Sequence, residues 1–219
     1  MIPAVRLLAL LGVFAAVTAV AVAAPAKEPK KAIVPAVQKR AKFIAVNLRD
    51  LPGFGWKSEP SQADRSSPHC SYYDPDQSKL TENGDYTSPD FTRADGLYAS
   101  SSIGIFVSAR QAQAAYSVVV RPQLPRCLGE VVAKSGKPGH ITVQSAGKLA
   151  FPSYGTRSAA FRVVFLVKSG TTPVAATIDL IAINKGTVDA AVIFGSAGQP
   201  PPVTIERKVV GAVAARMSK

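Results

Sequence analysis

Two histidines limit the chemistry that this chain can perform. His69 lies in a Ser/Pro-rich stretch and His140 in a Lys-Pro-Gly-His turn. A Ser/His/Asp triad or a zinc site would have to be built around one of them, and the sequence has neither Gly-x-Ser-x-Gly nor His-Glu-x-x-His. We therefore expect both histidines to be solvated loop residues, and we assign no catalytic or metal-binding residue.

An acidic segment offers oxygen ligands at alternate positions, which is the pattern of a calcium loop. Its members are Asp74, Asp76, Ser78, Glu82 and Asp85. In an EF-hand register that begins at Asp74, the sixth position is Lys79 instead of Gly and the twelfth is Asp85 instead of Glu. We expect an ordinary acidic turn here, with calcium binding as the minor alternative.

Other carboxylates leave open a hydrolase whose site no short motif reveals. Such an enzyme would use acidic groups such as Asp90, Asp95, Asp179 or Asp189 as proton donors and acceptors. Nucleotide cofactors are not expected, because Gly53-x-Gly55 lacks the third glycine of a dinucleotide loop and no Gly-x-x-x-x-Gly-Lys occurs. No cofactor of any kind is predicted.

Four aromatic residues are candidates for a ligand groove. They lie before and within the segment that contains the first cysteine: Trp56, Tyr72, Tyr73 and Tyr86. Aromatic side chains beside a turn also pack as ordinary core residues. The groove and the packing interpretation therefore both stay open.

The chain has two cysteines, Cys70 and Cys127. They form neither a Cys-x-x-Cys pair nor a cluster with histidine, and an exported chain meets an oxidising compartment. We predict a structural disulfide, for which the loop-entropy model gives roughly 4 kcal/mol of stabilisation.

The N-terminus predicts export. Arg6 precedes an apolar run from Leu7 to Ala24, and Ala21-Val22-Ala23 has the small residues that a signal peptidase recognises. We expect residues 1–23 to be a signal peptide cleaved after Ala23, and the protein to be secreted or extracytoplasmic, in association with the cell envelope. The alternative is that the apolar run stays in the bilayer as an anchor.

The formal net charge is +12. Such a charge attracts an exported protein to anionic surfaces, or it simply keeps the domain soluble. The expected partners are anionic envelope components or a small apolar ligand. Nucleic acid is not expected, because no Lys/Arg run is interleaved with stacking aromatics, and contact with a membrane would come only from an uncleaved signal or from charge.

Composition and periodicity divide the chain into three parts. Residues 24–35 mix Pro, Lys and Ala, which is typical of a flexible basic tether. Residues 36–217 then form one domain. We predict a helix after residue 36, irregular loop over 58–89, two strands over 91–107, a helix broken at Pro122, four strands over 141–194 and a final helix over 203–217.

This order of elements predicts an α+β fold. Strands that follow one another through short turns favour antiparallel pairing. We expect a single antiparallel sheet of about five or six strands, packed with N-terminal, central (broken) and C-terminal helices.

Several segments resemble a known family of exported actinobacterial proteins. They are the Leu51-Pro52-Gly53-x-Gly55-Trp56 turn after a helix, Cys70 in the next loop, the helix entry Phe106-Val107-Ser108-Ala109-x-x-Ala112, Pro125-Arg126-Cys127, and the terminal strand-turn-strand-helix. Together they resemble the extracellular sensor domain of a mycobacterial receptor serine/threonine kinase and, more broadly, the PsbP/Mog1-like α+β lipoprotein fold. The resemblance covers about Phe43 to Met217 and implies a fold and a binding-type role, with no catalytic residue.

These observations lead to two hypotheses of different class. The first is a non-catalytic extracytoplasmic binding or sensor-type domain protein of the cell envelope. The second is a secreted hydrolase with an unrecognised carboxylate-based site.

Overall fold

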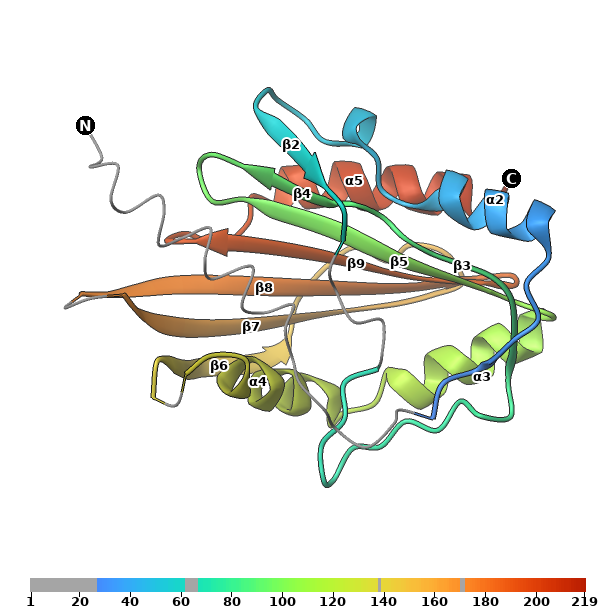
Figure 1. The fold of residues 1–219 in the computed structure, drawn as a ribbon, viewed down its shortest axis with the longest axis horizontal. Coiled ribbons are helices and arrows are strands. Elements are labelled where there is room, and N and C mark those ends of the chain that lie inside the picture. Colours follow the sequence, from blue (N-terminus) through green and yellow to red (C-terminus); the bar gives the residue numbers. More distant parts are fainter. Residues whose placement is uncertain (1–26, 62–66, 138, 170–171) are drawn as a thin grey trace.

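A nine-stranded sheet forms the centre of the molecule (Figure 1). The computed structural model describes residues 27–61, 67–137, 139–169 and 172–219. The strands follow the order β1 (Lys30–Lys31), β3 (Thr81–Thr87), β5 (Tyr98–Phe106), β9 (Val188–Ala197), β8 (Thr172–Lys185), β7 (Arg157–Ser169) and β6 (Ile141–Lys148). Off this path, β4 (Asp90–Arg93) pairs with β5, and β2 (Trp56–Glu59) pairs with β4.

The prediction of a single antiparallel sheet with five or six strands was wrong. The sheet has nine strands, and β1 pairs with β3 in parallel. The α+β class holds, but β3 and the second half of β2 lie in the stretch 58–89 that was expected to be irregular loop. Their sequences, Trp-Lys-Ser-Glu and Thr-Glu-Asn-Gly-Asp-Tyr-Thr, are mostly polar, so pairing with a neighbouring strand decides their conformation more than local propensity does.

The segment before the first helix also differs from the expectation. The sequence predicts a flexible tether over 24–35, yet Lys30 N–H donates to Leu80 O at 2.9 Å and Ala32 N–H to Glu82 O at 2.8 Å. The predicted signal peptide, residues 1–23, lies outside the described residues. In the ranges that the structure describes, no helix is both long and apolar enough to cross a membrane.

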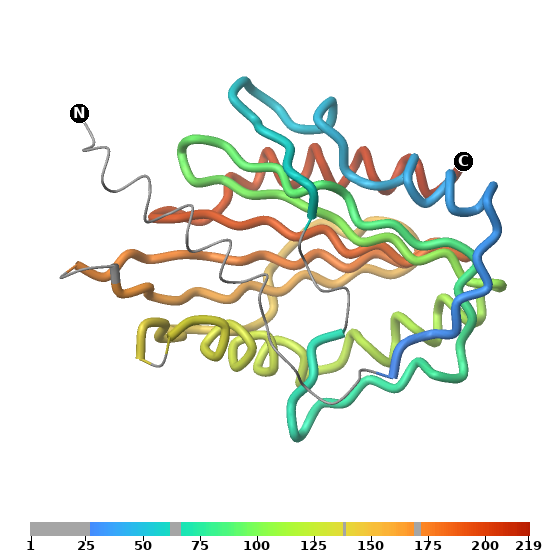
Figure 2. Tube along the Cα trace, in the orientation of Figure 1, coloured from blue at the N-terminus to red at the C-terminus, as the bar shows by residue number. Residues whose placement is uncertain are grey.

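The C-terminal part has the four expected strands, β6 to β9, joined as antiparallel neighbours. Strands β7 and β8 are the longest and run side by side along the whole molecule (Figure 2). Val, Ile and Phe are frequent in them, and these residues suit a pleated surface that is covered on both faces. This part of the sheet therefore follows directly from local sequence.

Helices cover both faces of the sheet (Figure 1). On one face, α2 (Pro35–Ile44) and α5 (Val203–Arg216) lie next to each other, and the short helix η1 (Leu48–Asp50) follows α2. On the other face lie α3 (Ala109–Val119) and α4 (Leu124–Lys134). Ser108 caps α3 by accepting a hydrogen bond from Gln111 N–H at 3.2 Å, and the predicted break at Pro122 separates α3 from α4.

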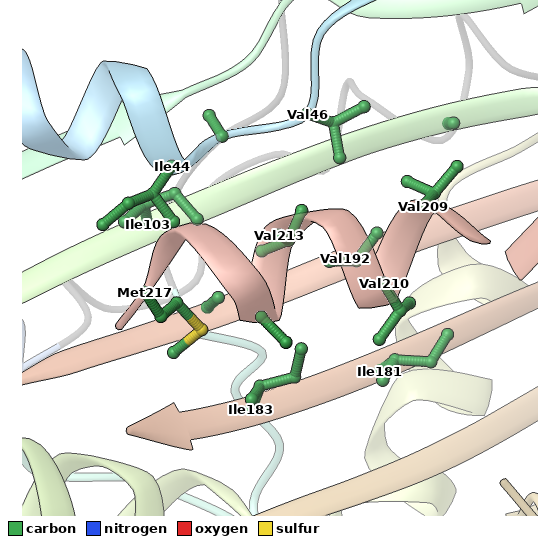
Figure 3. Packing of buried hydrophobic residues seen from close by; sticks show 14 of the residues in the cluster. Ile44, Val46, Ile103, Ile181, Ile183, Val192, Val209, Val210, Val213 and Met217 are labelled. Atoms are coloured by element: carbon green, nitrogen blue, oxygen red, sulfur yellow. The ribbon is translucent and has the colours of Figure 1, made fainter. Parts of the chain in front are cut away.

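The main hydrophobic core lies between the sheet and the α2/α5 layer (Figure 3). Val210 of α5 points toward Ile181 of β8, and Val209 and Val213 belong to the same buried cluster. The spacing of these valines places them on one face of a helix. Two smaller clusters join α4 to the opposite face of the sheet through Phe161, Val163 and Phe165, among others.

Candidate functional site

The predicted disulfide is present between Cys70 and Cys127. Both residues are buried, and their Cα atoms lie 5.8 Å apart. The bond attaches the long loop before β3 to α4. Around it pack Leu124 and Phe161, so the pair belongs to a hydrophobic cluster and has the surroundings of a structural disulfide.

The two histidines lie in loops. His69 Nδ1 is 3.1 Å from Asp74 Oδ1, while His140 is exposed and donates its backbone N–H to Lys137 O at 3.0 Å. Among the described residues, neither imidazole hydrogen-bonds to a hydroxyl or thiol group, and the His69 ring pairs with the surface carboxylate of Asp74.

The acidic residues that were considered as calcium ligands instead pair with two lysines. Lys27 Nζ donates to Asp74 at 3.0 Å, and this hydrogen bond lowers the pKa of the Asp74 carboxyl. Lys31 instead pairs with Glu82 and, at 3.0 Å, with Asp85. Within the part of the chain that the structure describes, no three His, Cys, Asp or Glu side chains converge as metal ligands.

The four aromatics fall into two pairs on opposite faces of the sheet. Trp56 and Tyr86 pack against the core beneath α2 and α5. Tyr72 and Tyr73 pack in the disulfide cluster beside α4, where their hydroxyls donate to Glu130 at 2.8 Å and to Val119 O at 2.6 Å. A groove lined by all four would have to pass through the sheet, so any ligand surface would involve one pair at a time.

The four candidate aspartates of the hydrolase alternative are dispersed. Asp90 accepts from Tyr98 Oη at 2.8 Å, and Asp95 pairs with Arg93 in a turn at 2.7 Å. Asp179 and Asp189 are on the central strands β8 and β9 and face opposite sides of the sheet, since Asp179 lies with the α5 layer and Asp189 beneath α3. The structure brings no two of them together.

Asp179 does belong to a buried cluster with Arg162 and Glu206. Residues 162 and 179 are directly opposite in the β7–β8 ladder, and the Arg162 guanidinium donates twice to the Asp179 carboxylate, at 2.7 and 2.6 Å. Glu206, in the first turn of α5, is 0% exposed. Burial, a hydrogen bond with Asp179 and the charge of Asp179 raise the pKa of Glu206 to about 8.

Glu206 is therefore a neutral acid at pH 7. Among the described residues, no N–H or hydroxyl group donates to either of its carboxyl oxygens. The protonated carboxyl needs no such donor, because it can itself donate to Asp179, whose charge Arg162 balances.

A protonated acid beside a carboxylate is the pairing that many acid–base enzymes use. A catalytic acid must lie within hydrogen-bond reach of its substrate. Here Asp179 and Glu206 are both 0% exposed beneath α5, so no substrate reaches the pair in this conformation. The cluster fits a structural role with a dependence on pH.

The sequence contained a signal for Glu206 that motif searches do not use. Glu206 precedes Val209 and Val210 by three and four positions, so the periodicity that predicts the buried face of α5 also includes this glutamate. A charged residue on the apolar face of a predicted helix requires a buried partner.

A half-buried carboxyl with a raised pKa lies beneath α3. Asp189 accepts from the Asn184 amide at 2.6 Å, and burial raises the pKa of its carboxyl to about 7, with the nearby Glu82 adding to the rise. Burial likewise raises the pKa of Glu82. Glu82 is buried, whereas Asp189 is half-buried.

The segment from α2 to β2 forms an open surface that is both apolar and cationic. Three large apolar side chains project from it: Phe43 is 53% exposed, Leu48 is 49% exposed and Phe54 is 99% exposed. Exposed cations lie between and beside them. We call this set the α2–β2 rim, and its members are Lys39, Lys42, Phe43, Leu48, Arg49, Phe54 and Lys57.

The turn at Phe54 is held in place on its inner side. Trp56 Nε1 donates to Pro52 O at 3.0 Å, and the Arg93 guanidinium lies 5.1 Å from the centre of the Trp56 ring and donates to the same carbonyl at 3.4 Å. Gly53 and Gly55 on either side of Phe54 have φ values of 83° and 85°, a conformation that side chains disfavour. The chain therefore reverses sharply and leaves the phenyl ring outside.

The other end of the rim is attached to α5. The Arg216 guanidinium donates to Ile44 O at 3.1 and 3.0 Å, to Ala45 O at 3.0 Å and to both oxygens of Asp50 at 2.8 and 2.7 Å. This residue closes the carbonyl end of α2 and neutralises a buried acid. These contacts join the α2 and η1 part of the rim to α5, along the upper edge of the view in Figure 1.

No protein-family model and no curated protein matches this chain. A solved structure to which it is similar is that of LpqN, described as involved in cell envelope biogenesis of Mycobacterium tuberculosis. The match has 8% identity and a TM-score of 0.31, and it covers 77% of this chain and 79% of that chain. It is a loose resemblance to an envelope protein, too weak to establish a common fold, and it gives no support to the finer resemblance to a kinase sensor domain.

Proposed function

We propose that this protein is a non-catalytic extracytoplasmic binding domain of the cell envelope, which recognises anionic envelope components through the α2–β2 rim. The observation that carries the proposal is the exposed positive charge of the rim. Among the described residues, no ion pair involves Lys39, Lys42, Arg49 or Lys57.

The distribution of acids explains why this charge stays uncompensated. Asp50 is the only acid between residues 29 and 58, and it is buried against Arg216. Other acids pair locally, such as Asp95 with Arg93 and Asp179 with Arg162. The four cations of the rim are therefore available to external anions.

The carboxyl groups support the non-catalytic alternative over the hydrolase. Glu206, whose pKa is raised, and its neighbour Asp179 are buried under α5. A small apolar ligand is not part of this proposal, because the four candidate aromatics are divided between two faces of the sheet.

Two variants with equal net charge test the proposal. The rim variant replaces Lys39, Lys42, Arg49 and Lys57 with Gln. The control variant replaces four exposed cations outside the α2/α5 layer with Gln: Arg110, Arg121, Lys137 and Lys168. Each is applied to phosphocellulose and eluted with a salt gradient, since salt screens charge attraction.

We expect the rim variant to elute at clearly lower salt than the wild-type protein and the control variant to stay close to it. If net charge alone determined retention, both variants would elute at equally reduced salt concentrations. That result would show that binding is not localised to the rim, and it would overturn the proposal.

A further inference from the structure

We infer that the α2–β2 rim docks on an anionic lipid bilayer, with the Phe54 side chain inserted among the lipids and the surrounding cations on the headgroups. This inference rests on the proposed function and names the partner of the same surface. Its evidence is the apolar part of the rim, which recognition of an anion alone does not require.

Phe54 is the first part of that evidence. Its side chain is 99% exposed, although the turn that presents it is fixed by the contacts of Trp56 and Arg93 with Pro52 O. A rigid turn with a phenyl ring at its apex keeps the ring in water at a cost in free energy. Inserting the ring into the acyl boundary of a bilayer removes that cost.

The rest of the rim also combines exposed apolar side chains with exposed cations. Lys39 and Phe43 are four residues apart in α2, so they lie on one face of the helix, and Lys42 is beside them. The next turn of the chain, η1, contributes Leu48 and Arg49, both exposed. Apolar and cationic side chains thus alternate along the segment.

This combination distinguishes a bilayer from a soluble or wall-bound polyanion. A polyanion would contact the cations and leave Phe43, Leu48 and Phe54 in water. A bilayer with anionic lipids offers favourable contacts to both the cations and the apolar side chains. Cations near its surface are attracted to the headgroups, while aromatic rings partition into the interface. The observed charge and apolar exposure therefore favour the lipid surface.

Trp56 provides a built-in probe. It is the only tryptophan of the chain and follows Phe54 by two residues. The experiment mixes the protein with vesicles of phosphatidylglycerol and phosphatidylcholine, measures bound protein by flotation, and measures quenching of Trp56 by brominated lipids. Vesicles of phosphatidylcholine alone test the need for anionic charge.

The test variant is Phe54→Ser and the matched control is Val107→Ser, which removes an apolar side chain of 45% exposure outside the rim. We expect Phe54→Ser to lower the vesicle partition coefficient about tenfold and to abolish Trp56 quenching, because a partly buried phenyl group contributes about that factor. Val107→Ser should bind as the wild-type protein does. Every variant begins at Ala24, the predicted mature N-terminus, because the apolar segment from Leu7 to Ala24 would itself partition into the vesicles.

Equal vesicle binding and equal quenching by Phe54→Ser and the wild-type protein would overturn the inference. If retention on phosphocellulose still depended on the rim cations, the proposed function would stand with a polyanion as its partner. If neither measurement depended on the rim, the proposed function would fall as well.

Discussion

Replacing Glu206 with Gln tests whether this glutamate is a buried neutral acid. The Gln side chain has nearly the same shape and stays uncharged at every pH. Its amide can donate to Asp179, as the protonated carboxyl does in the wild-type protein. The variant therefore keeps the packing beneath α5 and removes only the ionisation.

The structure sets the sign and size of the effect. Folding raises the pKa of Glu206 from 4.5 to about 8. Because the folded state holds the proton more tightly, this stabilisation is complete below pH 4.5 and is lost as pH rises to about 8. The slope is about 1.4 kcal/mol per pH unit, so the total loss is on the order of 5 kcal/mol.

A second group acts with the same sign over a lower range. The pKa of Asp189 rises from 3.8 to about 7 on folding, so its contribution disappears by about pH 7. Between pH 7 and 8, Glu206 is the group that continues to lose its proton. This interval separates the two carboxyls.

Urea unfolding at pH 5, 6, 7, 8 and 9 measures the effect. We expect the wild-type midpoint to keep falling above pH 7, and that of Glu206→Gln to level off there and to exceed the wild-type midpoint by about 1 M or more at pH 9. Glu59→Gln, which changes an exposed glutamate on β2, should follow the wild-type curve. Parallel curves for Glu206→Gln and the wild-type protein would refute the neutral buried acid.

Three further changes test the elements that hold the domain together. Replacing Cys70 and Cys127 with Ala should lower the free energy of unfolding by roughly 4 kcal/mol and make the urea midpoint insensitive to reductant, in contrast to the wild-type protein. Arg216→Met should cost about 3–5 kcal/mol in urea unfolding, because it leaves a buried aspartate without its cation; an unchanged midpoint would contradict this. Gly84→Ala should cost about 1–3 kcal/mol because its Cβ would lie 2.8 Å from the backbone carbonyl carbon of Val37, whereas Gly147→Ala, with no atom within 4 Å, should have no such effect.

Local sequence predicted those helices and strands whose own residues have a strong propensity for that conformation. Strands β6 to β9 are rich in branched and aromatic residues, and α5 has its apolar residues three and four positions apart. The two cysteines could be paired because the sequence has no third cysteine and its predicted export favours a disulfide. In each case, the evidence was residue type, spacing or compartment.

Local sequence failed for β1, β2 and β3. Their residues are mostly polar, and a strand of this kind is stable only because a neighbour supplies its hydrogen-bond partners. The same limit applied to the carboxylates. Asp179 could be named as a candidate, but that it faces Arg162 across a ladder and Glu206 from a helix depends on strand register.

The sequence by itself determined the chemical inventory of this protein: two cysteines, two histidines, a large excess of cations and no motif of a known reaction. The tertiary structure decided which of these groups are buried and which are exposed to solvent. It buried an acid pair that could otherwise have served catalysis, and it left Phe54 and four cations of the rim in solvent. The physical reason is that exposure and pKa depend on neighbours supplied by distant parts of the chain, which residue order does not specify.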